Sequence, residues 1–467
     1  MLPAGSPATI ARFLRSGKCP VCVMGLGRMG LPMSVLLAEA GVRVIGFDID
    51  ERAVRAVNSR RPHIAEKGLQ ERLRKLSPRL LRATTDPDEA IKESCVVTVV
   101  VPTLVRENGS PDYSYVVSAA STIGRYLRRE ALVVLQSTVG IGVTRKIFSR
   151  TIEKESGLTA GKDFLLAYSP IRAAAGSILR DLQHYSKVVG GINERSTDAA
   201  EGFLRTFVKG EIIRVSSIEA AEAAKLFELI YRDVNIALAQ QLATVCERYG
   251  LSYFEVCSAA NSQPYCHLHL PSVGVGGHCV PIVPYFLIRN PPRGATISLI
   301  EEARRFNKDV PKRIARRITR MIRTLKPRKP RIAFLGLTFK PNAKDVSFSR
   351  AIEIAKYLSG RGYAIRTYDP LLKPKEIEAL GLRAAPNFEA CLENANLVVI
   401  AVSHKAFRDR LSLDLITSYT DKRILGIFDG GGVLSLEAVR QLADRWPKRG
   451  RFLYTGVGVP TIRGGSL

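Results

Sequence analysis

Short runs of valine, isoleucine and leucine alternate with segments of helical periodicity along most of this chain, and this alternation constrains its fold more than any other feature. In the N-terminal part the strand-like runs are 21–24, 42–47, 95–101, 132–136 and 164–167. Strands that alternate with helices favour a parallel sheet with crossover helices. The sequence therefore predicts an α/β fold.

The same alternation occurs a second time after a long helical region. That region covers roughly 218–249 and ends at Gly250, a residue suited to a helix C-cap. The segment 325–330, LKPRKP, is typical of a linker. Strand-like runs then follow at 332–335, 364–368, 397–402 and 424–428, where the alternation ends. Two α/β domains joined by a helical region are the simplest prediction, and a chain of 467 residues is long enough for two or three domains.

Composition excludes two classes of protein. With 46% hydrophobic and 24% charged residues, the chain is not disordered throughout. Its apolar runs are of strand length, far below the roughly 18 residues of a membrane helix. The first eighteen residues are interrupted by Arg12 and Arg15 and make a poor secretory signal. We expect a cytoplasmic protein that does not bind membranes.

The formal net charge of +27 would attract polyanions. The most basic stretch is 304–331, in which Val310, Ile314 and Ile318 recur at helical spacing. This spacing predicts a helix with its basic residues on the solvent side. Because no nucleic-acid-binding motif or interleaved aromatic residues accompany the stretch, we interpret it as a solvated face and do not expect nucleic acid as a partner.

The cysteines do not form a disulfide framework. There are eight, scattered along a long chain, at positions 19, 22, 95, 246, 257, 266, 279 and 391. We expect free thiols in a reducing compartment. Cys19 and Cys22 form a CxxC pattern, but in a strand they point to opposite faces, which disfavours a redox or zinc role.

A glycine motif follows the first predicted strand and precedes an apolar helix. Gly25 permits a tight turn, Gly27 lets the backbone approach a pyrophosphate, and Gly30 lets helix and strand pack closely. The second strand ends at Asp48, eighteen residues after Gly30, where a carboxylate can bind both ribose hydroxyls. The same carboxylate repels a 2′-phosphate, so the predicted cofactor is NAD and the domain is Rossmann-like.

Cys279 ends a glycine-rich loop, GVGGHC, and is followed by Pro281, which suits a first helical turn. A thiolate is stabilised at a helix N-terminus, as a nucleophile requires. Two alternatives are a small buried apolar residue and a metal site. The candidate ligands for a metal are Cys266, His267, His269, His278 and Cys279. Their spacing matches no standard zinc pattern, so no metal is predicted.

A polar stripe runs along the helix predicted over 221–240. Lys225, Glu228, Arg232 and Asn235 are spaced i, i+3, i+7 and i+10. Such a stripe can face solvent, or its lysine can stabilise an oxyanion in a pocket. The pattern leaves both readings open.

With these residues in view, the chain resembles the nucleotide-sugar 6-dehydrogenases of the UDP-glucose/GDP-mannose dehydrogenase family over essentially its whole length. The matching segments are GLGRMGLP (25–32), RPHIAEKGL (61–69), VVVPTLV (99–105), QSTVGIGVT (136–144), EAAKLFELIYRDVNIA (222–237), GVGGHCVPIVPYFL (274–287), LGLTFKPNAKD (335–345) and SHKAF (403–407).

The resemblance implies a domain plan and a reaction. The domains would be an NAD-binding Rossmann domain at 1–208, a central helical domain used for dimerisation at 209–324, and a Rossmann-like domain that binds the UDP-sugar at 325–467. The C6 alcohol of the sugar would be oxidised twice, to an aldehyde and then to a thioester on Cys279 that water hydrolyses to a carboxylate. NAD, a UDP-sugar and a homodimer partner are thereby implied.

The resemblance also implies individual roles. The catalytic residues would be Cys279, Lys225 as the oxyanion-stabilising lysine, and Thr138 of the STV motif. Asn307 matches the asparagine of the helix before the last domain. The cofactor would contact Gly25, Gly27, Arg28, Met29, Gly30, Asp48, Thr103 and Thr138. The substrate would contact Lys225, Arg232, Gly276 and Lys340.

The chain departs from the family pattern at positions close to this chemistry. Ile171 stands where an acidic residue is expected, Leu229 where an asparagine is expected, and Val283 where an aspartate is expected. Ser347 replaces a usual arginine, and 271–274 reads PSVG in place of PGPG. A general base contributes about 10²–10⁴-fold, so these losses should nearly stop thioester hydrolysis.

Two explanations are compatible with the departures. Glu228, His278 or Arg172 could supply the missing base or charge, or the chain could bind NAD and a nucleotide sugar with little turnover. Because Cys279 and Lys225 are retained, we favour a working but altered enzyme. The GGHC form followed by PYF is closer to the UDP-N-acetylhexosamine branch, and UDP-N-acetylmannosamine is the expected substrate. A two-electron β-hydroxyacid-type dehydrogenase is the other alternative, disfavoured by the second α/β domain.

Overall fold

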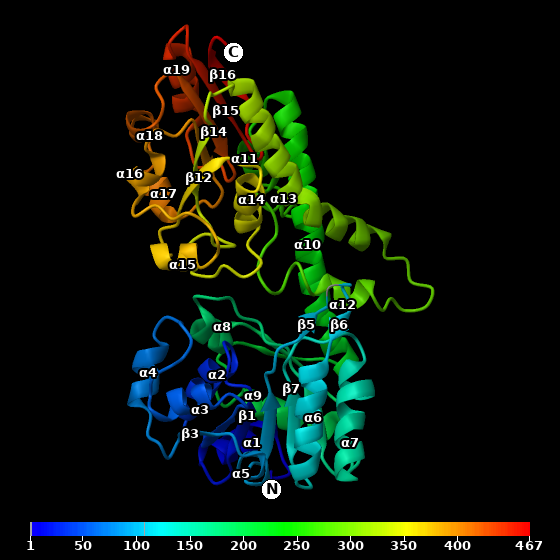
Figure 1. Ribbon diagram of the computed structural model, residues 1–467. Helices are drawn as coiled ribbons and strands as arrows, with labels where there is room; N and C mark the ends of the chain where they lie inside the picture. Colours follow the sequence, from blue (N-terminus) through cyan, green and yellow to red (C-terminus); the bar gives the residue numbers. More distant parts are fainter. Residues whose placement is uncertain (1, 107) are drawn as a thin grey trace. The chain divides into compact units, whose positions relative to one another are not determined.

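The computed structural model describes residues 2–106 and 108–467, which form two compact units. The first unit contains residues 1–228 and 285–292, and the second contains 229–284 and 293–467. Each unit is built around its own β-sheet (Figure 1). The α/β fold expected from the alternating sequence pattern is confirmed, with parallel strands dominating both sheets.

The sheet of the first unit has eight strands in the order β10-β9-β8-β7-β4-β1-β2-β3. Its strands are β1 (Val21–Met24), β2 (Val44–Phe47), β3 (Leu81–Thr84), β4 (Val96–Val99), β7 (Leu132–Leu135), β8 (Leu165–Tyr168), β9 (Lys187–Gly191) and β10 (Ile212–Arg214). Only β8 and β9 pair antiparallel within this sheet, among the residues described. A separate antiparallel pair consists of β5 (Leu104–Val105) and β6 (Pro111–Asp112).

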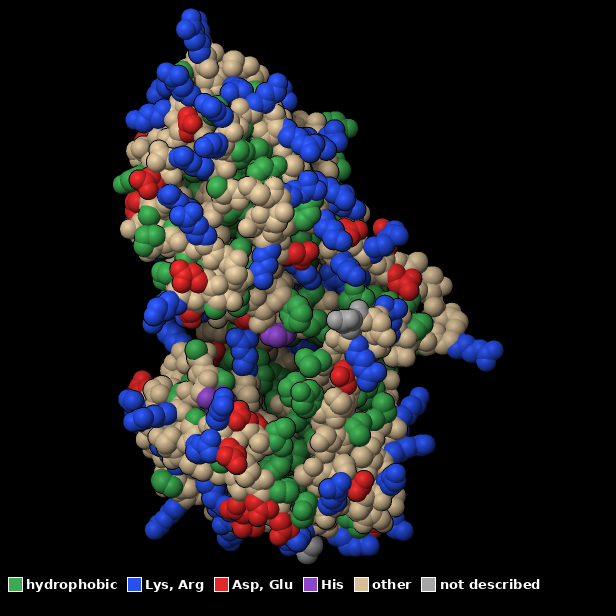
Figure 2. Space-filling view, in the orientation of Figure 1, with side chains coloured by type: hydrophobic (Ala, Val, Ile, Leu, Met, Phe, Trp, Pro, Cys, Tyr) green, Lys and Arg blue, Asp and Glu red, His purple; other side chains and the backbone are tan. Residues whose placement is uncertain are grey.

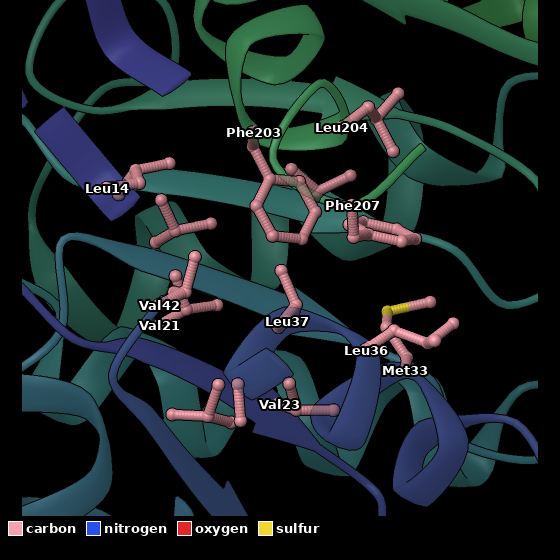
Figure 3. Close-up of a cluster of buried hydrophobic side chains, with 14 of the residues drawn as sticks. Leu14, Val21, Val23, Met33, Leu36, Leu37, Val42, Phe203, Leu204 and Phe207 are labelled. Atoms are coloured by element: carbon pink, nitrogen blue, oxygen red, sulfur yellow. The ribbon is translucent and has the colours of Figure 1, made fainter. Parts of the chain in front are cut away.

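Helices cover both faces of this sheet, because alternate strand side chains point to opposite sides. Val21 and Val23 of β1 belong to one apolar core, whereas Cys22 and Met24 belong to the other. Figure 3 shows the first core, where Leu36 and Leu37 of helix α2 lie near Phe203 and Phe207. That core is covered by α1 (Pro7–Arg15), α2 (Gly30–Glu39), α3 (Glu51–Asn58), α4 (Leu69–Lys75), α8 (Ile178–His184) and α9 (Glu194–Leu204). The opposite core is covered by α5 (Pro87–Lys92), α6 (Ser114–Tyr126), π-helix η1 (Thr144–Ser149) and α7 (Arg150–Ser156).

A disulfide joins Cys19 to Cys95, so the expectation that all eight cysteines are free is wrong for this pair. The two residues precede adjacent parallel strands, since Val21 of β1 is in register with Val96 of β4. Their Cα atoms lie 6.0 Å apart, within the range that a disulfide requires. The partners are 76 residues apart in sequence, and for that reason no local pattern shows the pairing.

The sheet of the second unit has six strands in the order β12-β11-β13-β14-β15-β16. These are β11 (Arg331–Leu335), β12 (Ala364–Tyr368), β13 (Leu397–Ile400), β14 (Ile424–Asp429), β15 (Arg451–Gly456) and β16 (Ile462–Gly465). The prediction that the alternation ends near 424–428 is wrong, because β15 pairs parallel to β14 and β16 then turns back antiparallel.

Two apolar cores again lie on opposite faces of the second sheet, with Phe334 of β11 in one and Leu335 in the other. The first core is covered by α13 (Ser298–Leu325), α14 (Arg350–Ser359) and α15 (Pro374–Glu378). The second is covered by α16 (Phe388–Leu392), α17 (Lys405–Arg410), α18 (Leu413–Tyr419) and α19 (Leu436–Arg445). This arrangement is the doubly wound architecture that the sequence predicts.

Two long helices, α10 (Ile218–Tyr249) and α13, account for the helical region between the sheets in sequence. The helix predicted over 218–249 is confirmed, and Gly250 follows it with a φ of +71°. Shorter helices α11 (Tyr253–Ala260) and α12 (Pro284–Ile288) lie between them in sequence. No helix in the described part of the chain is both long enough and apolar enough to cross a membrane.

The apolar stripe predicted on α13 is buried, with Val310, Ile314 and Ile318 packed in the core of the second unit. The prediction that the basic residues of this stretch face solvent is wrong for Arg304, which is only 3% exposed. Its guanidinium lies 2.9 Å from the Asp233 carboxylate of α10. A buried cation needs such a partner, and helical spacing alone does not reveal it.

Candidate active site

The glycine turn after β1 has the geometry expected of a dinucleotide cradle. Gly25 has a φ of +94°, and a Cβ there would lie 2.7 Å from the Val100 carbonyl oxygen. A Cβ on Gly30 would lie 1.8 Å from the Gly25 oxygen, so the helix can begin here only with glycine. A Cβ on Gly27 would meet nothing within 4 Å, which leaves its backbone open to a ligand. These observations fit NAD at the start of α2.

The Asp48 carboxylate is fixed at the end of β2 beside this turn. It accepts hydrogen bonds from the backbone N–H groups of Leu26, at 2.7 Å, and of Asp50, at 2.9 Å. The bond to Leu26 ties the carboxylate to the glycine turn itself. Next to it, the apolar side chain of Ile49 is 79% exposed. A half-buried carboxylate and an apolar surface at a strand end suit a ribose and a base.

Other cofactor candidates follow the carboxyl ends of neighbouring strands. Thr103 follows β4 and Thr138 follows β7, and both are half-buried. Arg28 is exposed and Met29 half-buried in the glycine turn. Ligands of open α/β sheets bind at this edge, where the strand order reverses between β1 and β4.

The loop after Thr138 is fastened to α10 by a buried carboxylate. Glu222 accepts hydrogen bonds from the backbone N–H groups of Gly142 and Thr144, the latter at 2.8 Å. Burial raises the pKa of Glu222 above its ordinary value, and these hydrogen bonds partly offset that effect. The contact holds the STV motif against the helix that carries Lys225.

Lys225 is buried in the protein and does not face solvent, whereas Arg232 of the same polar stripe is exposed. The Lys225 side chain is 8% exposed and its Nζ lies 2.6 Å from Glu228 Oε1. The other oxygen of Glu228 lies 2.9 Å from Nε of Arg172. Two cations thus share one carboxylate on the same side of the first unit.

The second unit has a cavity of about 260 Å³ at the carboxyl ends of three strands. It lies where β11, β13 and β14 end, at the point of this sheet where the strand order reverses. The walls include Phe254, Val273, Gly274, Thr338, Phe339, Arg350, Ser403, Arg408, Gly430 and Gly431. Two arginines in a crevice of this kind suit the phosphates of a nucleotide.

The glycine-rich loop before Cys279 packs against the segment that follows β11. A Cβ on Gly276 would lie 2.8 Å from the Phe339 Cβ, and one on Gly277 would lie 2.8 Å from the Phe339 ring. The N–H of Gly277 donates to the Ser347 carbonyl at 3.0 Å. The loop is therefore fixed to the wall of the cavity, and its glycines are needed for close packing.

Cys279 lies at the end of this loop and is exposed. The alternative that it is a small buried apolar residue is therefore wrong. Its carbonyl accepts from the N–H groups of Ile282 and Val283, which makes a single turn. The expectation that Pro281 starts a helix behind the thiol is wrong, because α12 begins only at Pro284. Cys279 therefore lies in a turn and not in the first turn of a helix.

A buried polar cluster supports the Cys279 turn from behind. Nη1 of Arg304 donates to the Val280 carbonyl at 3.3 Å as well as to Asp233 Oδ1. Asn307 donates to both the carboxylate and the carbonyl of Asp233, each at 2.8 Å. Burial raises the pKa of Asp233, although Arg304 and Asn307 oppose the shift. Asn307, which by resemblance matches a family asparagine, thus links α13 to α10 through these hydrogen bonds.

Not all predicted substrate residues line the cavity. Lys340 lies in sequence between the lining residues Phe339 and Pro341 but is not itself in the wall, and Gly276 is two residues after the lining residue Gly274. Arg232 is exposed on α10 near His269, whose pKa is lowered by burial and by this arginine. Sequence reasoning missed Arg350 and Arg408 as lining residues, because they reach the cavity from α14 and α17.

At three positions the chain has an apolar residue where the family pattern has a polar one, and the structure packs or buries these side chains. Ile171 packs against the core of the first unit, and Leu229 and Val283 are 3% and 4% exposed. None of them offers a proton acceptor. Among the residues described, no group of three histidine, cysteine or acidic side chains is placed to hold a metal ion.

Basic side chains are spread over the visible face of both units (Figure 2). The chain carries 70 Lys and Arg against 43 Asp and Glu. On the exposed side of α13 and the segment after it, residues 312–331 include ten Lys or Arg and no acidic residue. The chain as a whole therefore has a strong positive charge, which favours anionic ligands.

Comparison with known proteins agrees with the geometry. Residues 19–208 match the NAD-binding domain of the UDP-glucose/GDP-mannose dehydrogenase family, 219–309 its central domain, and 333–435 its UDP-binding domain. A UDP-N-acetyl-D-mannosamine dehydrogenase of Pyrococcus horikoshii is 34% identical over 390 residues, covering 83% of this chain and 90% of that protein. An NDP-N-acetyl-D-galactosaminuronic acid dehydrogenase of Ralstonia solanacearum is 35% identical, covering 85% and 93%.

Solved structures agree as well. The UDP-D-ManNAc dehydrogenase structure from Pyrococcus horikoshii matches with a TM-score of 0.83 and 32% identity, over 94% of this chain and 99% of that one. A UDP-glucose dehydrogenase from Pyrobaculum islandicum matches with a TM-score of 0.82 and 27% identity, over 98% and 100%. The three family domains follow one another along this chain, and the cradle after β1 and the cavity after β11 lie within them. The chain belongs to the UDP-glucose/GDP-mannose dehydrogenase family.

Proposed function

We propose that this chain oxidises the C6 alcohol of a nucleotide sugar, UDP-N-acetylmannosamine, to a carboxylate with NAD as oxidant. The observation that carries the proposal is an exposed thiol, Cys279, on a loop fixed to the wall of an arginine-lined cavity. The dinucleotide cradle after β1 supports it from the other unit. The names of the relatives in Pyrococcus horikoshii support the choice of sugar.

The binding roles follow from charge and shape. The backbone from Gly25 to Gly30 takes the pyrophosphate of NAD, and Asp48 takes the ribose hydroxyls, with Arg28, Met29, Thr103 and Thr138 completing the cofactor contacts. Arg350 and Arg408 bind the UDP phosphates in the cavity, beside Gly276 and Lys340. Arg232 of α10 contacts the substrate from outside the cavity wall. NAD, when bound, accepts a hydride from the sugar carbon in each of two steps.

The chain's own residues handle protons and the covalent bond. In the first oxidation the C6 hydroxyl gives up its proton and its carbon gives up a hydride, while the Lys225 ammonium stabilises the charge that develops on oxygen. The Cys279 thiolate then adds to the aldehyde carbon and forms a thiohemiacetal. Loss of a second hydride leaves a thioester. Water, placed beside Thr138, adds to the thioester carbon and the C–S bond breaks; the carboxylic acid is released, and the second proton of the water goes to the Cys279 sulfur, which is restored as the thiol.

Hydrolysis is the step that the replaced residues slow. Ile171, Leu229 and Val283 offer no base to the attacking water. Glu228 is a carboxylate in the same unit as Lys225, but both of its oxygens are engaged, one by Lys225 and the other by Arg172. We therefore propose that the two hydride transfers are faster than release of the acid, and that the thioester accumulates.

The test is stopped-flow absorbance of NADH combined with intact-protein mass spectrometry. UDP-N-acetylmannosamine, UDP-N-acetylglucosamine, UDP-glucose and GDP-mannose are each mixed with enzyme and NAD. We expect a burst of two NADH per chain with UDP-N-acetylmannosamine, a slow steady phase, and an acyl adduct on Cys279. No NADH with any of the four sugars contradicts the proposal, and sugar-dependent thermal stabilisation without NADH then identifies a binding protein.

We also propose a homodimer formed through α10. Tyr231, Leu238, Val245 and Tyr249 lie on one side of the helix and are 52%, 43%, 50% and 77% exposed. An apolar stripe of this length on a surface helix marks a protein interface.

We further propose the functional division into 1–208, 209–324 and 325–467, and a cytoplasmic location, where NAD and nucleotide sugars are made.

A further inference from the structure

Lys187, the first residue of β9, is buried without a partner. Its side chain is 3% exposed, and among the residues that the structure describes its Nζ has no hydrogen-bond partner. The amine is not at a surface where water would solvate it. An ammonium group in that position is costly unless an anion reaches it.

The strand register explains how the amine comes to be unpaired. β8 and β9 are antiparallel, with Ala167 opposite Gly191 and Tyr168 opposite Gly190. Continued beyond Tyr168, this register sets Lys187 opposite Ile171. The Arg172 guanidinium donates to the Ser186 carbonyl at 3.4 Å, in agreement with that register. Ile171, in the loop that follows β8, offers no carboxylate to the lysine.

Other cations surround the same place. Burial lowers the pKa of Lys187 to about 8, and the positive charges of Lys225 and Arg172 add to the shift, whereas Asp181 opposes it. Asp181 is already engaged, since it accepts from Arg180, Ser177 and the Ala174 N–H. Glu228 is engaged by Lys225 and Arg172. Glu228 and Asp181 are thus both engaged by other donors, and among the residues described neither forms a hydrogen bond with the Lys187 amine.

The cluster is open to a ligand at one edge. The side chains of Arg172 and Glu228 are 24% and 30% exposed, while Lys225 and Lys187 lie deeper. Lys225 is the residue proposed above to face the C6 oxygen of the sugar. An anion that reaches Lys225 from the sugar would therefore be a group on C6.

We propose that Lys187, Lys225 and Arg172 form a binding site for a carboxylate on the ligand, so that the chain holds a nucleotide uronate more tightly than the neutral nucleotide sugar. The cluster supplies charge-assisted donors, and the carboxylate supplies the negative charge that Ile171 does not. The identification of the carboxylate with C6 rests on the proposed function. The existence of the anion site rests on the cluster alone.

The experiment compares two ligands that differ only at C6, UDP-glucuronate and UDP-glucose, by calorimetry without NAD so that no turnover occurs. We expect UDP-glucuronate to bind at least about tenfold more tightly near pH 7, the value of one added charge-assisted contact. The preference should decline above about pH 8, where Lys187 loses its proton. Equal affinities for the two ligands overturn the inference.

Three variants test the residues. Lys187→Met should abolish the preference, and it should also raise the melting temperature, because it removes an unpaired buried charge. Ile171→Glu should abolish the preference by placing a carboxylate of the protein in the site. Lys162→Met, which removes an exposed lysine of the same unit, should retain it. A preference that persists in both Lys187→Met and Ile171→Glu overturns the inference.

Failure of the inference is distinguishable from failure of the proposed function. NADH formation with equal affinity for the two ligands contradicts only the carboxylate site. A uronate preference that depends on Lys187, without NADH formation, contradicts only the oxidation and supports the site.

Discussion

Cys279 is the residue on which the proposed chemistry depends most directly. Its thiol is exposed in a loop whose glycines pack against Phe339. Replacement by serine keeps the shape but removes the good nucleophile, so Cys279→Ser should give at most one NADH per substrate and a steady-state rate at least about 100-fold lower. Cys266→Ser, at a half-buried cysteine outside the loop, is the matched control. Unchanged stoichiometry in Cys279→Ser would rule out the covalent route.

Asp369, at the end of β12, is a buried counterpart of Asp48. Its carboxylate accepts from the N–H groups of Leu337 and Thr338, at 2.7 and 3.1 Å. The N–H of Asn342 donates to Nδ1 of His404, so the imidazole hydrogen is on Nε2 and faces Asp369 at 3.2 Å. Burial alone would raise the pKa of Asp369, but the interaction with His404 and the backbone hydrogen bonds outweigh it and lower the pKa below its ordinary value.

We expect Asp369→Asn to lower the free energy of unfolding by about 2 kcal/mol near neutral pH, because it weakens several buried hydrogen bonds. A carboxylate with a lowered folded-state pKa stabilises the fold above its unfolded pKa, and this contribution is lost as the pH falls through the folded value. The gap between the two proteins should therefore close in acid. Urea unfolding at several pH values measures it, and a gap independent of pH would contradict this account.

At the scale of elements, the Cys19–Cys95 disulfide ties the starts of β1 and β4 together. Closing a loop of 76 residues should stabilise the fold by about 2–4 kcal/mol. Alkylation in denaturant without reductant should modify six cysteines, and all eight after reduction. Cys19→Ser should unfold at lower denaturant, whereas Cys391→Ser should leave the disulfide intact. Eight reactive thiols before reduction would contradict the bond.

The apolar stripe of α10 makes a separate prediction. Val245→Glu should place a charge in the proposed interface and shift the protein from dimer to monomer in analytical ultracentrifugation, while the circular dichroism spectrum is retained. Leu299→Glu is the matched control, because Leu299 is 70% exposed on α13 and lies outside the stripe. A wild-type protein that sediments as a monomer would remove the basis for the interface.

At the scale of the whole molecule, the net charge of +27 should steer anionic ligands to both sites. Raising salt from about 0.1 to 1 M shortens the screening length from about 10 to 3 Å. We expect the association rate of UDP-sugar to fall several-fold over that range, with little change for uridine, which carries no phosphate. Equal salt dependence for the two ligands would show that the field does not act on the phosphates.

Most of the fold was predictable because its determinants are local. An alternation of strand and helix periodicity needs only neighbouring residues, and the runs at 21–24 and 364–368 became β1 and β12 with the same bounds. Gly25 and Gly30 were also assigned from spacing, and each is in a position that a side chain would obstruct. Strands β15 and β16 were missed although helix α19 separates β15 from β14, and the two strands follow each other with no helix between them.

Features that depend on two distant segments could not be predicted. Cys19 meets Cys95, and Arg304 meets Asp233, only because sheet order and helix packing bring them together. Arg350 and Arg408 converge on one cavity from separate helices.

By itself, the sequence determined the two α/β sheets and the glycine turn after β1, because each depends on residues that are close together along the chain. Only the tertiary structure decided that Lys225 is buried beside Glu228, that Lys187 has no partner opposite Ile171, and which arginines line the cavity. The physical reason is that a charge is paired or unpaired according to what the fold places around it. Residues far apart along the chain determine those surroundings.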